Sequence, residues 1–228
     1  MKHKGVFFEA VETTIPVMLG YLFVGIAFGM LFQEKGYNFL WAAAMSVFVY
    51  AGSMQFIGIN FFVPGVSLVE VALMTLLVNV RHIFYGLSMI EPFSHMGRKK
   101  PYMIFSLTDE TYSLLVNIKN EEGHADKLMF LISFLDQCYW IIGSILGSLI
   151  GSMLPFDTTG IDFALIALFV VIFTEQWLSC SDHRPALCGT ACGLLSLVVF
   201  WAENMVIPSM ILIVLVLMAM KKKAGDAS

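Results

Sequence analysis

The stretch LLVNVRHIFYGLSM, residues 76–89, lies inside a long apolar run, yet it places Asn79, Arg81 and His82 close together near the middle of that run. The whole run, residues 66–90, predicts a membrane-crossing helix, because spanning the hydrocarbon core takes about 17 to 25 mostly apolar residues. A charged side chain at the centre of such a helix costs about 2.5 to 3.5 kcal/mol when it faces lipid. We therefore expect the arginine and the histidine to face protein or water inside a helical bundle.

The composition of the whole chain supports this environment. Of its 228 residues, 58% are hydrophobic and 13% are charged, and the mean hydropathy is +0.82. Soluble domains carry roughly 25% charged residues, so this chain has too little polar surface to cover a water-exposed globule. The sequence predicts an all-α integral membrane protein, with residues 1–228 forming one polytopic domain in the lipid bilayer.

The apolar runs predict about seven transmembrane helices. They lie near residues 13–32, 39–63, 66–90, 128–153, 160–180, 186–206 and 207–220. Residues 103–118 are shorter and carry Asp109 and Glu110 in their middle, which predicts a re-entrant or half-membrane segment. Acidic residues precede the first run, so we expect that run to stay in the protein and not to act as a removable signal.

Lysine and arginine residues predict the orientation, because short cytoplasmic loops are rich in them. Such loops lie near residues 95–101, 119–127 and 181–184 and at the C-terminus, which is predicted to be cytoplasmic. Seven spans then place the N-terminus outside, with Lys2 and Lys4 as misfits. An eight-span alternative, in which residues 103–118 cross fully, puts the N-terminus inside but exports the basic residues near 98–100.

An internal echo suggests a repeat. At an offset of 121, AMSVFVYAGSMQF (44–56) overlaps IALFVVIFTEQWL (166–178), so that Gln55 matches Gln176. We expect two inverted three-helix repeats with broken helices, over about 13–90 and 128–206, an arrangement common among secondary transporters. The alternative is chance similarity between apolar segments.

The buried polar residues call for partners inside the membrane. A guanidinium at membrane depth normally pairs with an acid, and Asp109, Glu110, Asp136 and Glu175 are the candidates for Arg81, among which the sequence does not choose. The NVRH segment lies at the bundle centre if protein surrounds its helix. It also does so if the helix unwinds there, and unwound backbone at membrane depth would itself indicate a binding site.

Several residues allow a functional and a structural interpretation. Gln55 and Ser53 could bind a substrate or could bridge helices, and His82 could carry a proton or only pack. Glycines in GIAFG, GSILGSLIG and GTACG indicate close helix packing. The four cysteines lack zinc-like spacing, and motifs for metalloprotease, serine hydrolase or phosphate-loop chemistry are missing. We therefore expect no metal, no disulfide, no cofactor and no enzymatic activity, which leaves transport.

Five stretches carry a family resemblance. They are PVMLGYLFVGIAFG (16–29), YAGSMQF (50–56), LLVNVRHIFYGLS (76–88), LTDETY (107–112) and FVVIFTEQW (169–177). In this order they resemble the AzlC-type large subunit of the branched-chain amino acid exporter, or azaleucine-resistance, family. The resemblance implies ion-driven export of amino acids such as leucine, isoleucine and valine across the bacterial inner membrane. It also implies a small AzlD-type membrane subunit as partner, and no nucleic acid.

The polar positions of these motifs form the predicted substrate-binding or coupling site. They are Ser53, Gln55, Asn79, Arg81, His82, Tyr85, Thr108, Asp109, Glu110, Glu175 and Gln176. Arg81 or free backbone N–H groups could bind an amino-acid carboxylate, and Asp109, Glu110 or Gln55 could bind its ammonium group. The alternative functions are a membrane channel, or a scaffold without transport whose polar cluster only joins helices.

Overall fold

A computed structural model describes residues 5–62, 65–116, 118, 124–153, 170, 173–174, 177–178 and 182–225. These residues form helices and connecting segments, with no β-strand among them, as the sequence predicts. The chain divides into two compact units, Met1–Ile166 and Ala167–Ser228. Among the described residues, three helices are long and apolar enough to cross a membrane, or four if a bent pair counts as one span.

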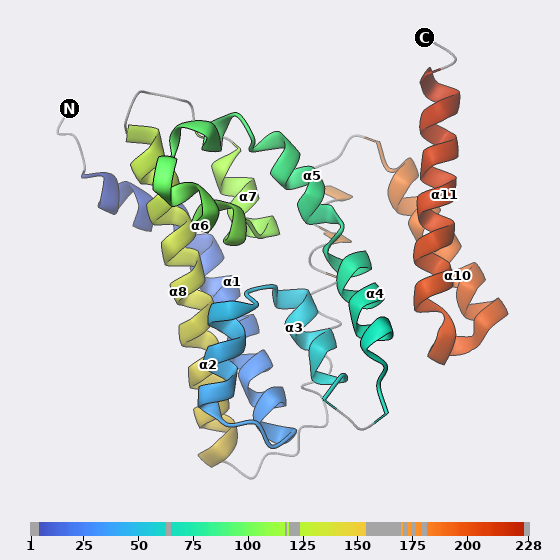
Figure 1. The fold of residues 1–228 in the computed structure, drawn as a ribbon, viewed down its shortest axis with the longest axis horizontal. Coiled ribbons are helices and arrows are strands. Elements are labelled where there is room, and N and C mark those ends of the chain that lie inside the picture. The colour runs from blue at the N-terminus through green and yellow to red at the C-terminus, as the bar shows by residue number, and fades with distance from the viewer. Residues whose placement is uncertain are drawn as a thin grey trace. The chain divides into compact units, whose positions relative to one another are not determined.

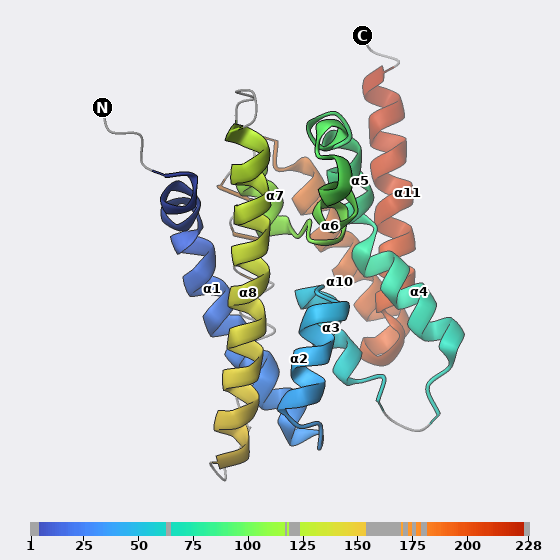
Figure 2. The same ribbon diagram turned by 60° about the vertical axis from the view of Figure 1, so that its left-hand side comes forward.

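Two long helices form the frame of the first unit. Helix α1 (Val6–Glu34) and helix α8 (His124–Met153) lie side by side (Figures 1 and 2). A Cβ atom on Gly29 would overlap the backbone of α8, and one on Gly147 would overlap the backbone of α1. The two backbones are therefore in direct contact, which confirms the predicted packing role of these glycines.

The helices α1 and α8 run parallel. Gly25 lies against Gly143, and the next contacts along α1 meet later residues of α8, up to Met30 beside Gly151. The predicted inverted three-helix repeats would make these two helices antiparallel. The structure therefore departs from that expectation, and the reason lies in the segment that follows α1.

Residues 39–63 were expected to form one span, and this prediction is wrong. Helix α2 (Phe39–Phe48) ends before Tyr50, whose φ is +42°, and helix α3 (Gly52–Ile59) turns back. After α3, the ring of Phe62 lies 4.9 Å from the ring of Tyr37, which precedes α2. The chain thus returns to its starting level, and α2 with α3 forms what we name the first hairpin. This removes one crossing from the expected seven.

The next two helices form the bent pair. Helix α4 (Leu68–Asn79) and helix α5 (Arg81–Ser88) meet at an angle of 45°. They correspond to the predicted span 66–90, and the bend lies at the NVRH segment, where the sequence suggested a break. The bend brings Arg81 to the first position of α5.

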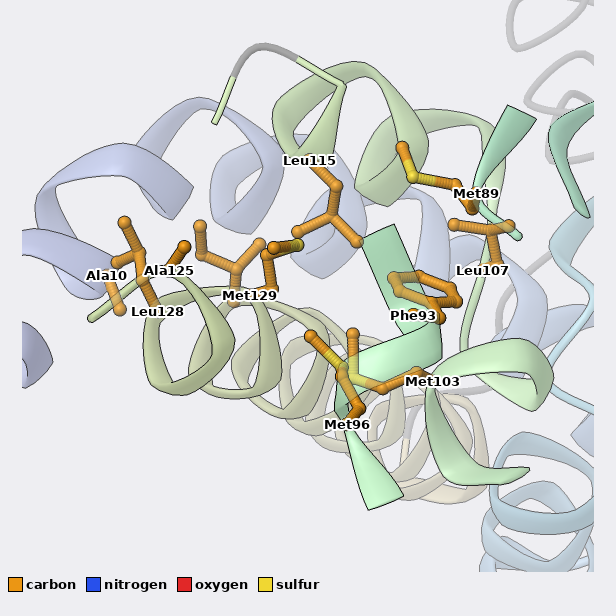
Figure 3. Close-up of a cluster of buried hydrophobic side chains, with 11 residues drawn as sticks. Ala10, Met89, Phe93, Met96, Met103, Leu107, Leu115, Ala125, Leu128 and Met129 are labelled. Carbon is orange, nitrogen blue, oxygen red and sulfur yellow. The ribbon is translucent and has the colours of Figure 1, made fainter. Parts of the chain in front are cut away.

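A second hairpin follows two short 3₁₀ helices, η1 (Pro92–His95) and η2 (Gly97–Lys99). Helix α6 (Lys100–Phe105) and helix α7 (Asp109–Leu115) turn back on each other at residues 106–108 (Figure 1). Their apolar sides share one buried cluster with α1, α8 and η1 (Figure 3). This fold-back fits the re-entrant segment predicted for residues 103–118.

The second unit contains helix α10 (Arg184–Asn204) and helix α11 (Val206–Gly225). Non-helical backbone angles at Trp201 interrupt α10, and the part before it is a candidate span. A Cβ atom on Gly189 or Gly193 would meet no described atom within 4 Å, so these glycines show no close packing. Most of the predicted span 160–180, including its match to residues 44–56, lies outside the described residues.

Candidate functional site

The two hairpins meet at their tips. The ring of Phe105, at the end of α6, lies 6.2 Å from the ring of Tyr50, at the turn of the first hairpin. Gln137, near the middle of α8, joins both: its Oε1 accepts a hydrogen bond from Tyr102 Oη at 2.7 Å, and its Nε2 donates to Val47 O at 3.3 Å. The non-helical turns of the two hairpins thus lie together beside the middle of α8.

Arg81 and Asp109 form an ion pair next to these tips. Arg81 Nη1 lies 2.6 Å from Asp109 Oδ2, and Arg81 Nη2 donates a hydrogen bond to Ser53 Oγ at 3.1 Å. The pair therefore joins α5, α7 and α3, each through a residue in its first turn. Among the candidate acids that lie in the described residues, Asp109 is the one that pairs with Arg81.

Two atoms of this ion pair have unused hydrogen-bonding capacity. Arg81 Nε and Asp109 Oδ1 are buried and have no hydrogen-bond partner among the described residues. A buried polar atom without a partner costs about 1 to 3 kcal/mol. Such atoms in a folded protein therefore call for a water molecule or a ligand.

A second polar group lies directly beside the ion pair. Tyr21 Oη, near the middle of α1, donates a hydrogen bond to Glu110 Oε2 at 2.8 Å and lies 2.6 Å from Thr108 Oγ1. Thr108 Oγ1 lies 3.0 Å from Thr111 Oγ1, which donates to Asp136 Oδ2 at 2.8 Å. Thr108 also caps α7 by accepting from Thr111 N. The cap and the side chains of α7 together link α1 to α8.

Sequence reasoning missed two members of this group. Asp136 was a candidate partner for Arg81 but was not placed in the predicted site, and Tyr21 was not singled out at all. Asp136 is fully buried, and its Oδ1 has no hydrogen-bond partner among the described residues. The signal for Asp136 was its presence in the apolar run 128–153, whereas a tyrosine in an apolar helix carries no such signal.

Gln55 does not join the ion pair. It is fully buried, its Oε1 accepts from Trp140 Nε1 at 2.9 Å, and its Nε2 donates to Ser46 Oγ at 3.4 Å. Ser46 Oγ in turn donates to Ser144 Oγ at 2.9 Å. These contacts connect α3, α2 and α8, which favours the helix-bridging interpretation of Gln55 over a binding role.

The remaining predicted residues divide by position. His82 Nδ1 lies 3.1 Å from Asn79 O, so this ring nitrogen has a partner within the bend itself. The ring of Tyr85 stacks on Tyr112 at 4.6 Å, and its hydroxyl is within electrostatic reach of Asp109. Glu175 and Gln176 lie outside the described residues. In the described part of the chain, no group of three or more His, Cys, Asp or Glu could hold a metal ion.

Comparison with known proteins identifies the family of this chain. A family model described as AzlC protein matches residues 16–154. The chain is 38% identical to the branched-chain amino acid transport protein AzlC of Bacillus subtilis, over 97% of this chain and 87% of that protein. It is 40% identical to an uncharacterized membrane protein of Helicobacter pylori, over 95% of this chain and 96% of that protein. It is 27% identical to the inner membrane protein YgaZ of Escherichia coli, over 81% of this chain and 77% of that protein. No solved structure matches. The chain therefore belongs to the AzlC family of membrane proteins.

Proposed function

We propose that this protein is a secondary transporter that exports branched-chain and similar hydrophobic amino acids across the bacterial inner membrane. The observation that carries the proposal is the Arg81–Asp109 ion pair at the hairpin tips, with one unused donor and one unused acceptor. The similarity to a protein named for branched-chain amino acid transport supports the substrate class. Transport is preferred to catalysis because the site has binding groups without nucleophile or metal motifs.

The unused atoms complement an amino acid. Arg81 Nε can donate to the substrate carboxylate, and Asp109 Oδ1 can accept from its ammonium group. The exposed ring of Phe105, which lies beside the buried ring of Tyr50 at the adjacent tips, offers apolar surface to an aliphatic side chain. A zwitterion bound in this way neutralises its own charges against an existing ion pair, which lowers the cost of burying them.

The broken helices suggest how access changes. Discontinuous helices near the membrane midplane are typical of transporters, in which the binding site stays fixed while flanking elements open alternately to each side. We propose that export is driven by an ion gradient. We also propose that a small AzlD-type membrane subunit assembles with this chain, as the family resemblance implies.

Efflux of labelled leucine from preloaded cells tests the function. We expect efflux from cells that contain this chain with the small subunit, and a fall to background with Arg81→Ala or Asp109→Asn. Arg98→Ala is the matched control, because Arg98 is an exposed arginine outside the site. Wild-type efflux by an Arg81→Ala protein of normal abundance would contradict the site assignment. Equal efflux with and without the small subunit would contradict the proposed partnership.

The alternative functions give different results in the same assay. A scaffold without transport should give no efflux above background even from the wild-type protein, and its double variant Arg81→Ala with Asp109→Ala should be more stable than either single variant. A transporter should lose efflux in all three variants. A channel should release leucine at a rate that external leucine does not change, whereas an alternating-access transporter should respond to it.

A further inference from the structure

A buried chain of three hydroxyl groups connects two carboxyl groups beside the proposed amino-acid site. The hydroxyls of Tyr21, Thr108 and Thr111 belong to side chains that are at most 8% exposed. Asp136, at one end, is fully buried, and Glu110, at the other end, is half-buried next to the ion pair. The chain thus runs from the edge of the binding site into the interior of the helix bundle.

The number of hydrogens shared by these three hydroxyl and two carboxyl groups determines the net charge of the group. Four oxygen–oxygen links join the five groups, with distances of 2.8, 2.6, 3.0 and 2.8 Å from Glu110 to Asp136. Each link needs one hydrogen, and the three hydroxyls supply three, because an ionised carboxylate only accepts. With both carboxyls ionised, one link brings two oxygens together without a hydrogen. One added proton, on either carboxyl, completes all the links.

The surroundings of Asp136 lead to the same conclusion. Among the described residues, no basic side chain pairs with it, and its Oδ1 has no hydrogen-bond partner. The titratable groups within its electrostatic reach are Glu110 of α7, Tyr21 of α1, Tyr50 after α2 and Tyr102 of α6. None of these is a cation, whereas Glu110 also faces Asp109 and Arg81. Burial disfavours a carboxylate that has no cation beside it, so two ionised ends are unfavourable.

We propose that Glu110 and Asp136 share a single proton, and that this proton is the ion coupled to amino-acid movement. With the proton on Asp136, every hydroxyl donates toward Glu110, and with the proton on Glu110, every hydroxyl donates toward Asp136. A shift of each hydrogen by one link moves the proton between the two ends. Only O–H bonds break and form, and the proton is taken from water and returned to water. The coupling part rests on the proposed transport function.

Two substitutions test the hydrogen count directly. In Asp136→Asn or Glu110→Gln, the new amide permanently supplies the fourth hydrogen, so the remaining carboxylate can stay ionised with all links complete. Infrared difference spectroscopy of the full chain in lipid vesicles, across a pH titration, detects the C=O stretch of a protonated carboxyl group. We expect each single variant to lose the same band. The control Ser133→Ala removes a buried hydroxyl of α8 that does not belong to the hydrogen-bonded series, and this variant should retain the band.

The infrared outcomes are decisive in both directions. Loss of the band in both single variants supports a shared proton. A band that survives both substitutions, or that disappears with only one of them, overturns sharing.

A transport measurement then tests the coupling. The measurement uses vesicles that contain this protein and the small subunit, and it compares leucine flux with and without a pH gradient. The ratio of the two fluxes should fall to one in Asp136→Asn and should stay at the wild-type value in Ser133→Ala. A wild-type ratio in Asp136→Asn overturns coupling through this proton. If the wild-type protein moves no leucine, the transport function fails, and the infrared result still decides whether the proton is shared.

Discussion

Arg81 and Gln55 both interrupt apolar runs, but their surroundings give them different roles. Both amide atoms of Gln55 are used by Trp140 and Ser46. Arg81 contacts Asp109 and Ser53 and still has Nε without a partner. A buried residue whose polar atoms are all used stabilises the packing of helices. A residue with unused capacity, placed where two hairpins meet, can bind something else.

Gln55→Leu should therefore affect stability and not transport. The change leaves Trp140 Nε1 buried without an acceptor, which should lower the free energy of unfolding by about 1 to 3 kcal/mol. Thermal unfolding of the purified protein measures the loss, and leucine efflux per inserted molecule should stay at the wild-type level. Adding Trp140→Phe removes the unpaired donor, so the double variant should be more stable than the sum of the single effects implies. Unchanged stability together with lost efflux would contradict the bridging role.

At this scale, the sequence indicated which residues are polar at membrane depth but not which of them meet. Arg81, Asp109 and Glu110 could be found because charged residues are costly in apolar runs. Their pairing depends on the turn at residues 106–108, which sets which of two adjacent acids faces Arg81. Tyr21 could not be identified from the sequence, because a tyrosine fits an apolar helix whether or not its hydroxyl makes a functional hydrogen bond.

At the scale of elements, the hairpins show why apolar length alone does not count membrane crossings. Residues 39–63 are apolar enough to span a bilayer, yet they form two short helices that pack against α1 and α8. A segment surrounded by protein needs apolar residues as much as one surrounded by lipid. Long helices such as α1 and α8 were predictable from their apolar runs. The turn at Tyr50 depends on a positive φ, which a tyrosine in the sequence does not indicate.

Thiol cross-linking can establish the first hairpin. In a chain whose native cysteines have been replaced, Tyr37→Cys and Phe62→Cys should be joined by a short bifunctional reagent, because the two rings are 4.9 Å apart. A continuous helix would separate these positions by about 37 Å, at 1.5 Å per residue. The control pair Tyr37→Cys and Tyr50→Cys spans one arm of the hairpin and should not be joined. Absence of cross-linking between positions 37 and 62 would restore the single-span interpretation.

At the scale of the whole molecule, the hairpins change the membrane topology. Residues 39–62 and 103–116 turn back, so if residues 160–180 and α11 cross as the sequence predicts, the crossings are α1, the bent pair, α8, residues 160–180, α10 and α11. This even number would put both termini on one side. All lysines and arginines except Lys35 and Arg81 then fall on the cytoplasmic side, including Lys2 and Lys4, which the seven-span prediction exported.

Reporter fusions test this topology. We expect a fluorescent protein that folds only in the cytoplasm to be active at both the N-terminus and the C-terminus. A periplasmic phosphatase fused after Ser67, in the connection before α4, should be active, because that connection follows one outward crossing. The same phosphatase fused after Arg98 should be inactive. An N-terminus outside, with the C-terminus inside, would return the count to an odd number.

The glycine contacts between α1 and α8 have a mechanical consequence. Because a Cβ atom at Gly29 or Gly147 would overlap the opposite backbone, these two helices cannot slide past each other without first separating. They therefore move as one rigid body during any conformational change. Tyr21 and Asp136 belong to these two helices, whereas Arg81, Asp109 and Glu110 lie on the bent pair and the second hairpin. Movement of the bent pair and the second hairpin against α1 and α8 would stretch or break the links of Tyr21 to Glu110 and Thr108 and the link of Thr111 to Asp136. The same displacement would therefore disconnect the two carboxyl groups.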